Sequence, residues 1–324
     1  MPEFRIQHIT KYIYQGFVRD SANQIILYPI NDAYQKVLKQ ELNISGNPLI
    51  DTFTDYYGNK AGTFTHCIPH YEMEIFSKVL VVTNPKPLPV DDMFAASQWM
   101  DLEKIRNQVP YIDYLKQEYF EKSEVLKKIV LKLRRTGDTP FQTALAFCKY
   151  VFENFKYIPG ITTVETTLDE IWKLKAGVCQ DFAHILLVML RMLDIPGRYV
   201  SGYICPNKNG MRGEGATHAW VEVYIPGYGW LGLDPTNNCV ANETHVRLAV
   251  GRNFSDCSPV KGVYKGAAGH VLKVAVSVSY EGDDTAQIGV THTPLADIET
   301  SNDYSKNSFQ RHMEIVQQQQ QQQQ

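Results

Sequence analysis

The feature that most constrains the fold is the segment Gln180–Leu193, in which apolar side chains surround most of the circumference of a helix. The rest of the chain has to enclose such a helix, so the sequence predicts a buried central helix that Pro196 and Gly197 end. Cys179 stands where the helix begins, and the unpartnered N–H groups and positive dipole there favour the thiolate, the nucleophilic form. Gly177 predicts an unusual backbone angle and the close approach of a ligand.

The composition of the chain limits its partners. With 324 residues, of which 44% are hydrophobic, the chain is large enough for two globular domains. The formal net charge is −3 and the chain has no long basic run, so we expect neither nucleic acid nor a membrane surface as a partner. No apolar run is long enough to cross a bilayer, and strand-like sequence begins without a secretory leader, which favours the cytoplasm. In that compartment the six widely spaced cysteines are expected to be free thiols.

The first part of the chain, residues 1–84, is predicted to be a β-rich N-terminal domain that is sandwich-like, because short strand-like segments follow one another without a long helix. Strands are expected at 4–14, 24–28, 36–44 and 77–83, and the turn residues at 55–60 predict a hairpin. Residues 85–92 are predicted to be a linker, since closely spaced prolines favour extended backbone.

The second part, residues 93–295, is predicted to be an α+β core. Helices are expected at 121–135 and 141–155, and strands at 198–204, 219–225, 230–233 and 271–280. A capping side chain at Thr139, directly before Pro140, is a strong start signal for the second of these helices. Residues 296–324 are polar and end in eight glutamines, so we predict a disordered tail.

A nucleophilic cysteine needs a base, and His218 suits this role better than His184. His184 lies five residues beyond Cys179, which places it about 140° away around the helix, so we expect a hydrogen-bonded core histidine there. His218 follows the glycine-rich loop 213–217 and begins a predicted strand, where a base can meet a substrate. The alternative for His218 is an ordinary surface histidine.

Asp234 is the candidate that orients this base. The turn at 226–229 makes the strands before and after it antiparallel neighbours, which brings His218 and Asp234 close together. Because side chains alternate between faces, the two share a face only if the loop has an odd length or a bulge, for which Gly227 and Gly229 are suited. A regular four-residue loop would place them on opposite faces, and we predict that it does not form. The alternative for Asp234 is a plain Asp-Pro turn.

Three parts of this sequence resemble the transglutaminase-like superfamily in its bacterial form. They are residues 176–184 with 195–203, residues 217–222 and residues 230–236. Residues 157–160 are similar to the segment that leads into the core of bacterial members. The N-terminal part is similar to the β domain that often precedes this core.

The resemblance implies a papain-like core, with the cysteine helix packed on an antiparallel sheet and Cys179, His218 and Asp234 as nucleophile, base and orienting carboxylate. The thiolate attacks an amide carbonyl and forms a thioester, which water or a second amine resolves. The backbone N–H of Cys179 is a candidate oxyanion donor. Further candidates for the lining of the acyl site, with packing in the core as the alternative, are Gln180, Trp220 and Tyr157.

The sequence therefore predicts a cysteine enzyme that acts on an amide bond of a peptide or protein, with hydrolysis favoured over cross-linking to a primary amine. We expect no cofactor and no metal, because no acidic segment resembles a calcium loop and His66–Cys67–Ile68–Pro69–His70 lacks a second ligand cluster. The alternative is a non-catalytic peptide-binding or protein-binding module on the same fold. The presence of all three candidate residues argues against it.

Overall fold

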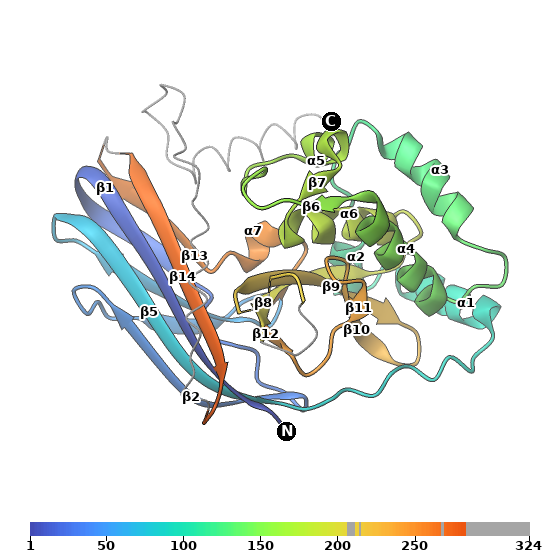
Figure 1. Ribbon diagram of the computed structural model, residues 1–324, viewed down its shortest axis with the longest axis horizontal. Helices are drawn as coiled ribbons and strands as arrows, with labels where there is room; N and C mark the ends of the chain where they lie inside the picture. Colours follow the sequence, from blue (N-terminus) through green and yellow to red (C-terminus); the bar gives the residue numbers. More distant parts are fainter. Residues whose placement is uncertain (206–210, 214, 267–268, 283–324) are drawn as a thin grey trace.

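The computed structural model describes residues 1–205, 211–213, 215–266 and 269–282. A curled sheet and a helix-covered core stand side by side in it (Figure 1). The predicted tail at 296–324 lies outside the described residues. The six cysteines are free thiols, as predicted. Among the described residues, no helix combines the length and the apolar composition that a membrane crossing requires.

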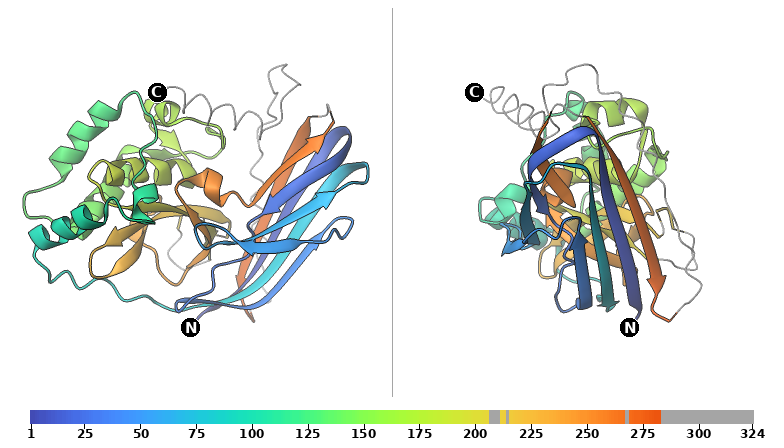
Figure 2. Two further views of the ribbon diagram at one scale, coloured as in Figure 1. Left: turned by 180° about the vertical axis from the view of Figure 1, so that it is seen from behind. Right: turned by 90° about the vertical axis from the view of Figure 1, so that its left-hand side faces the viewer.

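The curled sheet contains most of the N-terminal residues. Its N-terminal strands are β1 (Glu3–Ile25), β2 (Gln35–Ile44), β3 (Asp51–Thr54), β4 (Lys60–His66) and β5 (His70–Thr83), in the order β2-β5-β1-β4-β3. The long strand β1 joins the two halves, since its first part pairs with β5 and its last part pairs with β4. The predicted sandwich-like domain thus takes the form of one bent sheet (Figure 2).

Two strands from the end of the chain complete this sheet. Both β13 (Val260–Lys265) and β14 (His270–Tyr280) pair with β1, and Phe4 lies opposite Tyr280. The strand predicted at 271–280 is therefore present, but it belongs to the N-terminal sheet. This differs from the expected division of the chain, in which all of 93–295 belongs to the core. Strand β1 lies inside the sheet, so its backbone groups need partners along both edges: its first part pairs with β5 and β14, and its last part pairs with β4 and β13.

The helices of the core begin with α1 (Ala95–Ile105) and α2 (Tyr111–Tyr114). They continue with α3 (Ser123–Leu133), α4 (Pro140–Asn154), α5 (Leu168–Leu174), α6 (Cys179–Arg191) and the short α7 (Phe254–Cys257). The start signal of α4 is confirmed, because Thr139 and Gln142 form a reciprocal capping box around the first turn. As predicted, α6 is central and almost entirely buried.

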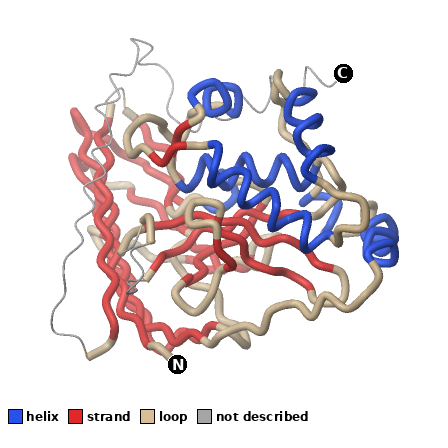
Figure 3. Tube along the Cα trace, turned by 45° about the vertical axis from the view of Figure 1, so that its right-hand side comes forward, coloured by secondary structure: helices blue, strands red, loops and turns tan. Residues whose placement is uncertain are grey.

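The core sheet lies beneath α4 and α6 (Figure 3). Its antiparallel order is β11-β10-β9-β8-β12, formed by β8 (Gly197–Ile204), β9 (Thr217–Ile225), β10 (Gly229–Asp234), β11 (Cys239–Val240) and β12 (His245–Gly251). Helix α6 packs on β8 and β9. A short parallel pair, β6 (Lys156–Tyr157) and β7 (Ala176–Gly177), leads into the start of α6.

The N-terminal sheet covers the open edge of the core at β12. The side chain of Asn59, in the β3–β4 hairpin predicted at 55–60, donates to the carbonyl of Val250 at 2.7 Å and accepts from its N–H at 2.8 Å. Gln35 makes the same pair of bonds with the backbone of Arg247, at 2.8 and 2.7 Å. Because β12 is an edge strand, these amides satisfy backbone groups that would otherwise lack partners.

The connection between the two parts runs as an extended segment along the core (Figure 1). Lys86 donates to the carbonyl of Trp230 at 2.6 Å, and the hydroxyl of Tyr228 donates to the carbonyl of Pro87 at 2.7 Å. The predicted linker is therefore extended, as its prolines require, and it is fixed to the β9–β10 hairpin.

Candidate active site

Cys179 is the first residue of α6, so its backbone N–H has no partner within the helix. The start of the helix is fixed by Asp181, whose carboxylate accepts the N–H of Val178 at 2.7 Å and the hydroxyl of Thr162 at 2.6 Å. Asp181 is buried, whereas Cys179 is partly exposed. The fold thus presents one thiol at the positive end of a rigid buried helix, as the sequence predicted.

Gly177 has a different role from the one expected. Its φ angle lies outside the left-handed region, so its backbone conformation is open to other residues. A Cβ atom at this position would lie 2.3 Å from a carboxylate oxygen of Asp181. Glycine is required here because the side chain of Asp181 packs directly against the chain.

The hairpin of β9 and β10 has the geometry that the triad hypothesis requires. Ile225 pairs with Gly229, which leaves a three-residue loop, and Gly227 and Gly229 have φ angles of 77° and 95°. The odd loop length places His218 and Asp234 on the same face of the sheet. The predicted parity is confirmed, and these two side chains are in direct contact.

His218 and Asp234 form a buried hydrogen-bonded ion pair. Nε2 of His218 lies 2.9 Å from Oδ2 of Asp234, and both side chains are fully buried. Burial alone lowers the pKa of His218, but the charge and hydrogen bond of Asp234 outweigh burial and raise that pKa to about 10. Burial raises the pKa of Asp234, yet His218 and His245 hold it far below its ordinary value. The imidazole is therefore charged at neutral pH.

The other ring nitrogen of His218, Nδ1, faces the nucleophile. Nδ1 is buried and makes no regular hydrogen bond to a described residue. The Cys179 thiol nevertheless lies near enough to contribute to the raised pKa of His218, and Nε2 is already engaged with Asp234. A loose contact between nucleophile and base is common in sites without a substrate. Gly213, with a φ of 80°, lies next to this nitrogen: a Cβ atom at position 213 would be 3.1 Å from Nδ1 of His218.

The loop after β10 holds the Asp234 carboxylate. Oδ1 accepts the backbone N–H groups of Thr236 at 2.8 Å and Asn237 at 3.3 Å. The amide of Asn237 donates to Oδ2 at 2.7 Å and also to the carbonyl of Arg212 at 3.2 Å. The Asp-Pro turn and the catalytic hypothesis are therefore compatible, because the same carboxylate accepts hydrogen bonds from the backbone of the turn and from His218. The polar residues 236–238, which follow the Asp-Pro pair, are the sequence signal for these contacts.

His245, the first residue of β12, belongs to the site although no motif in the sequence indicates it. Its Nε2 lies 3.3 Å from Oδ2 of Asp234, so this oxygen faces two histidines. Among the described residues, one group of side chains has potential metal-ligand atoms close enough together to hold an ion. It consists of His218, Asp234 and His245. The two short contacts are direct hydrogen bonds from each ring to the carboxylate, so the three ligand atoms that face one another are already engaged. The group is a hydrogen-bonded cluster and a poor fit for a metal.

The remaining candidates have clear positions. His184 is a core histidine, as predicted, because Nε2 accepts the N–H of Phe254 at 3.2 Å. Trp220 is buried and lies against His218 and His245, with ring centroids 6.1 and 5.2 Å apart, which supports its core alternative. Tyr157 pairs with the strand that leads to Cys179, and burial raises its pKa to about 12. Gln180 is partly exposed beside Cys179.

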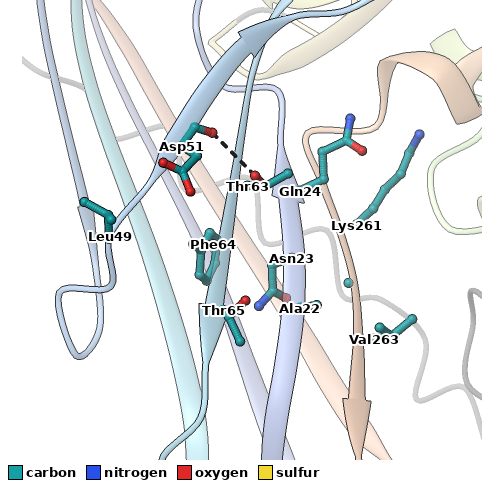
Figure 4. Close-up of a pocket in the computed structure, with 11 residues that line it drawn as sticks. Ala22, Asn23, Gln24, Leu49, Asp51, Thr63, Phe64, Thr65, Lys261 and Val263 are labelled. Carbon is teal, nitrogen blue, oxygen red and sulfur yellow. Dashed lines mark hydrogen bonds between the residues drawn. The ribbon is translucent and has the colours of Figure 1, made fainter.

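Two features outside this site offer less chemistry. His66 and His70 lie close together, with ring centroids 4.2 Å apart, but with Cys67 they do not form a group of three ligand atoms. A shallow depression lies on the N-terminal sheet between β1, β3, β4 and β13 (Figure 4). It holds one acidic and one basic side chain, Asp51 and Lys261, and it includes none of the candidate catalytic residues.

Two family models match this chain. Residues 127–235 match the transglutaminase-like superfamily, and residues 4–82 match the bacterial transglutaminase-like N-terminal region. An uncharacterised protein of Mycobacterium leprae is 29% identical over 283 residues, which cover 86% of this chain and 99% of that protein. A protein-glutamine gamma-glutamyltransferase of Pseudomonas aeruginosa is 33% identical over 95 residues, or 27% of this chain and 14% of that protein.

A solved structure shares the fold along most of the chain. It is a protein of Cytophaga hutchinsonii, proposed to be a cysteine protease, with a TM-score of 0.67 and 22% sequence identity. The match covers 87% of this chain and 92% of that one. The α+β architecture with a papain-like core is thereby confirmed.

Proposed function

The chain belongs to the transglutaminase-like superfamily, and we propose that it is a thiol enzyme that attacks an amide bond of a peptide or protein through Cys179. The observation that carries the proposal is the buried pair of His218 and Asp234, 2.9 Å apart, next to a partly exposed thiol at a helix N-terminus. A buried imidazolium beside a thiol supports the thiolate form of that thiol.

The acylation step follows from the positions of these groups. The Cys179 thiolate forms a bond to the amide carbonyl carbon, and the negative charge moves to the carbonyl oxygen. The unpartnered N–H of Cys179 is available to that oxygen. His218 then gives its Nδ1 proton to the leaving nitrogen, the carbon–nitrogen bond breaks, and ammonia or an amine departs. The product is a thioester on Cys179 with a neutral His218.

Resolution of the thioester decides the type of reaction. Neutral His218 takes a proton from the attacking molecule, which is water in hydrolysis and a primary amine in transfer, and the thiolate leaves. We propose hydrolysis as the main reaction, as a cysteine protease or amidase carries out. The second candidate is amine transfer, which the name of the matching Pseudomonas relative favours. A third candidate is a binding module that holds peptides without turnover.

The proposal is tested with a library of glutamine-containing peptides, with and without a primary amine, followed by mass spectrometry. Hydrolysis gives shortened or deamidated peptides in both samples, whereas transfer gives peptides that carry the amine. Cys179→Ala should abolish either product, and Cys67→Ala, which removes an exposed thiol of the N-terminal sheet, should not. Peptide binding without any product in the folded protein would contradict the enzyme and support the binding module.

The other partners stay predictions. We propose a peptide or protein as substrate, and neither nucleic acid nor a membrane as a partner, on the net charge of −3 and the lack of a long basic run. The cytoplasmic location also stays a prediction.

A further inference from the structure

The carboxylate oxygen Oδ2 of Asp234 is shared by two histidines. His218 on β9 lies 2.9 Å from it and His245 on β12 lies 3.3 Å from it. His245 is buried, with 5% of its surface exposed, and it lies against the ring of Trp220. It therefore has no access to a substrate, and a role in the reaction has to pass through Asp234.

The carboxylate of Asp234 indicates which ring nitrogen of His245 carries a proton. Oδ2 of Asp234 can only accept, so the 3.3 Å contact places a proton on Nε2 of His245. Nδ1 of His245 lies 3.3 Å from the backbone N–H of Asn242 and 3.4 Å from Oδ1 of the same residue, and a neutral ring with its proton on Nε2 accepts the first of these contacts. The loop before β12 is itself fixed, because the side-chain oxygen of Asn242 accepts the N–H of Thr244 at 2.9 Å and its hydroxyl at 2.7 Å. The ring of His245 thus has its Nε2–H directed at Asp234.

We propose that His245 is a positioning residue of this site, whose Nε2–H holds the Asp234 carboxylate in the orientation in which Oδ2 receives the Nε2–H of His218. The inference rests on the proposed function, because it assigns a role toward the same base. His245 acts together with Asn237, whose side-chain amide also donates to Oδ2, at 2.7 Å. The result is a chain from the backbone of Asn242 through His245 and Asp234 to His218.

The groups around His245 agree with a neutral donor. Asp234 faces it from β10, His218 from β9 and Glu243 from the preceding loop. Burial and the positive charge of His218 lower the pKa of His245 more than the two carboxylates raise it. One histidine of the cluster is therefore charged and the other neutral, so the carboxylate accepts from both without repulsion between two cations.

Three variants test the inference, with the rate of Cys179 alkylation by iodoacetamide near pH 6 as the readout. His245→Leu removes the donor at similar volume and should lower this rate about tenfold to a hundredfold, the range for a hydrogen bond to a charged group. His245→Gln offers an N–H at the place of Nε2 and should restore the rate to within about threefold. The matched control is His8→Leu, because His8 is equally buried in the N-terminal sheet and bonds to Tyr203 and Thr10.

The outcomes separate the two proposals. An unchanged rate in folded His245→Leu, or an equal loss in His245→Gln, overturns the role of His245 as a donor. Alkylation of Cys179 no faster than that of Cys67 in the unchanged protein contradicts the proposed function instead. If His245→Leu does not fold, NMR of the ring nitrogens of His245 in the unchanged protein shows which of them carries the proton and so tests the inference. We expect His245 as the neutral Nε2–H form near pH 7, and a proton on Nδ1 would refute the inference.

Discussion

Replacing Asp234 with Asn removes the charge that keeps His218 protonated. The pKa of His218 rises from its ordinary value of 6.5 to about 10 in the folded protein. This difference corresponds to about 5 kcal/mol of interaction free energy, to which Asp234 makes the largest favourable contribution and Cys179 a smaller one. Without the charge of Asp234, burial is the largest remaining influence and lowers the pKa of His218, so we expect a neutral ring at pH 7.

The loss of the imidazolium should be visible in the reactivity of Cys179. A free thiol with a pKa near 8.5 is thiolate to only about 0.3% at pH 6. The proposed mechanism requires the imidazolium of His218 beside Cys179, so we expect Asp234→Asn to lower the alkylation rate of Cys179 near pH 6 by roughly a hundredfold. The assay is labelling with iodoacetamide from acidic to alkaline pH, with each cysteine quantified by peptide mass spectrometry.

The control for Asp234→Asn is Asp32→Asn, because Asp32 is a carboxylate that pairs with Arg247 outside the site. It removes the same charge and should leave the labelling of Cys179 unchanged. A rate in folded Asp234→Asn within about threefold of the unchanged protein near pH 6 would refute the reasoning, since the thiolate would then not depend on this carboxylate.

Three further results are expected. Gly213→Ala should slow the alkylation of Cys179 more than Gly215→Ala does. Both glycines have positive φ angles, so both substitutions strain the backbone, but only a Cβ at position 213 would contact His218. Labelling rates test this difference, and melting temperatures report the backbone strain that the two variants share. Asn59→Ala should lower the free energy of unfolding, measured in urea, by about 1–3 kcal/mol, because it leaves the buried N–H and carbonyl of Val250 without partners. Asn43→Ala, at an exposed position, should have little effect. The buried imidazolium–carboxylate pair stabilises the fold fully between about pH 4 and pH 6.5, loses its effect below that window as the carboxylate is protonated, and loses it again as the pH rises to about 10. The difference in unfolding free energy between the unchanged protein and Asp234→Asn should therefore shrink from pH 6 to pH 10.

The central part of the site could be predicted because its signals are local. The all-apolar helix after Cys179 predicts a buried central element, and the two glycines near the turn predict the odd loop that brings His218 to Asp234. Both inferences use only the periodicity of one helix or of one hairpin.

The parts that were missed depend on contacts between distant residues. Phe4 pairs with Tyr280, and nothing near either residue indicates the other, so the membership of β13 and β14 in the N-terminal sheet is invisible in the sequence. His245 likewise begins an ordinary strand, and only the fold brings it to Asp234. The unusual backbone angle predicted for Gly177 was wrong, because the glycine is needed to leave space for the side chain of Asp181, one helical turn further along the chain.

The most direct test of the central claim is the ratio of the alkylation rates of Cys179 and Cys67 near pH 6. Cys67 is exposed and lies outside the site, so it serves as the reference thiol in the same molecule. An activated Cys179 should react at least about tenfold faster than Cys67 although it is less exposed, and His218→Ala should abolish this advantage. A ratio of one or less in the unchanged protein, or a ratio that His218→Ala leaves intact, would contradict the account.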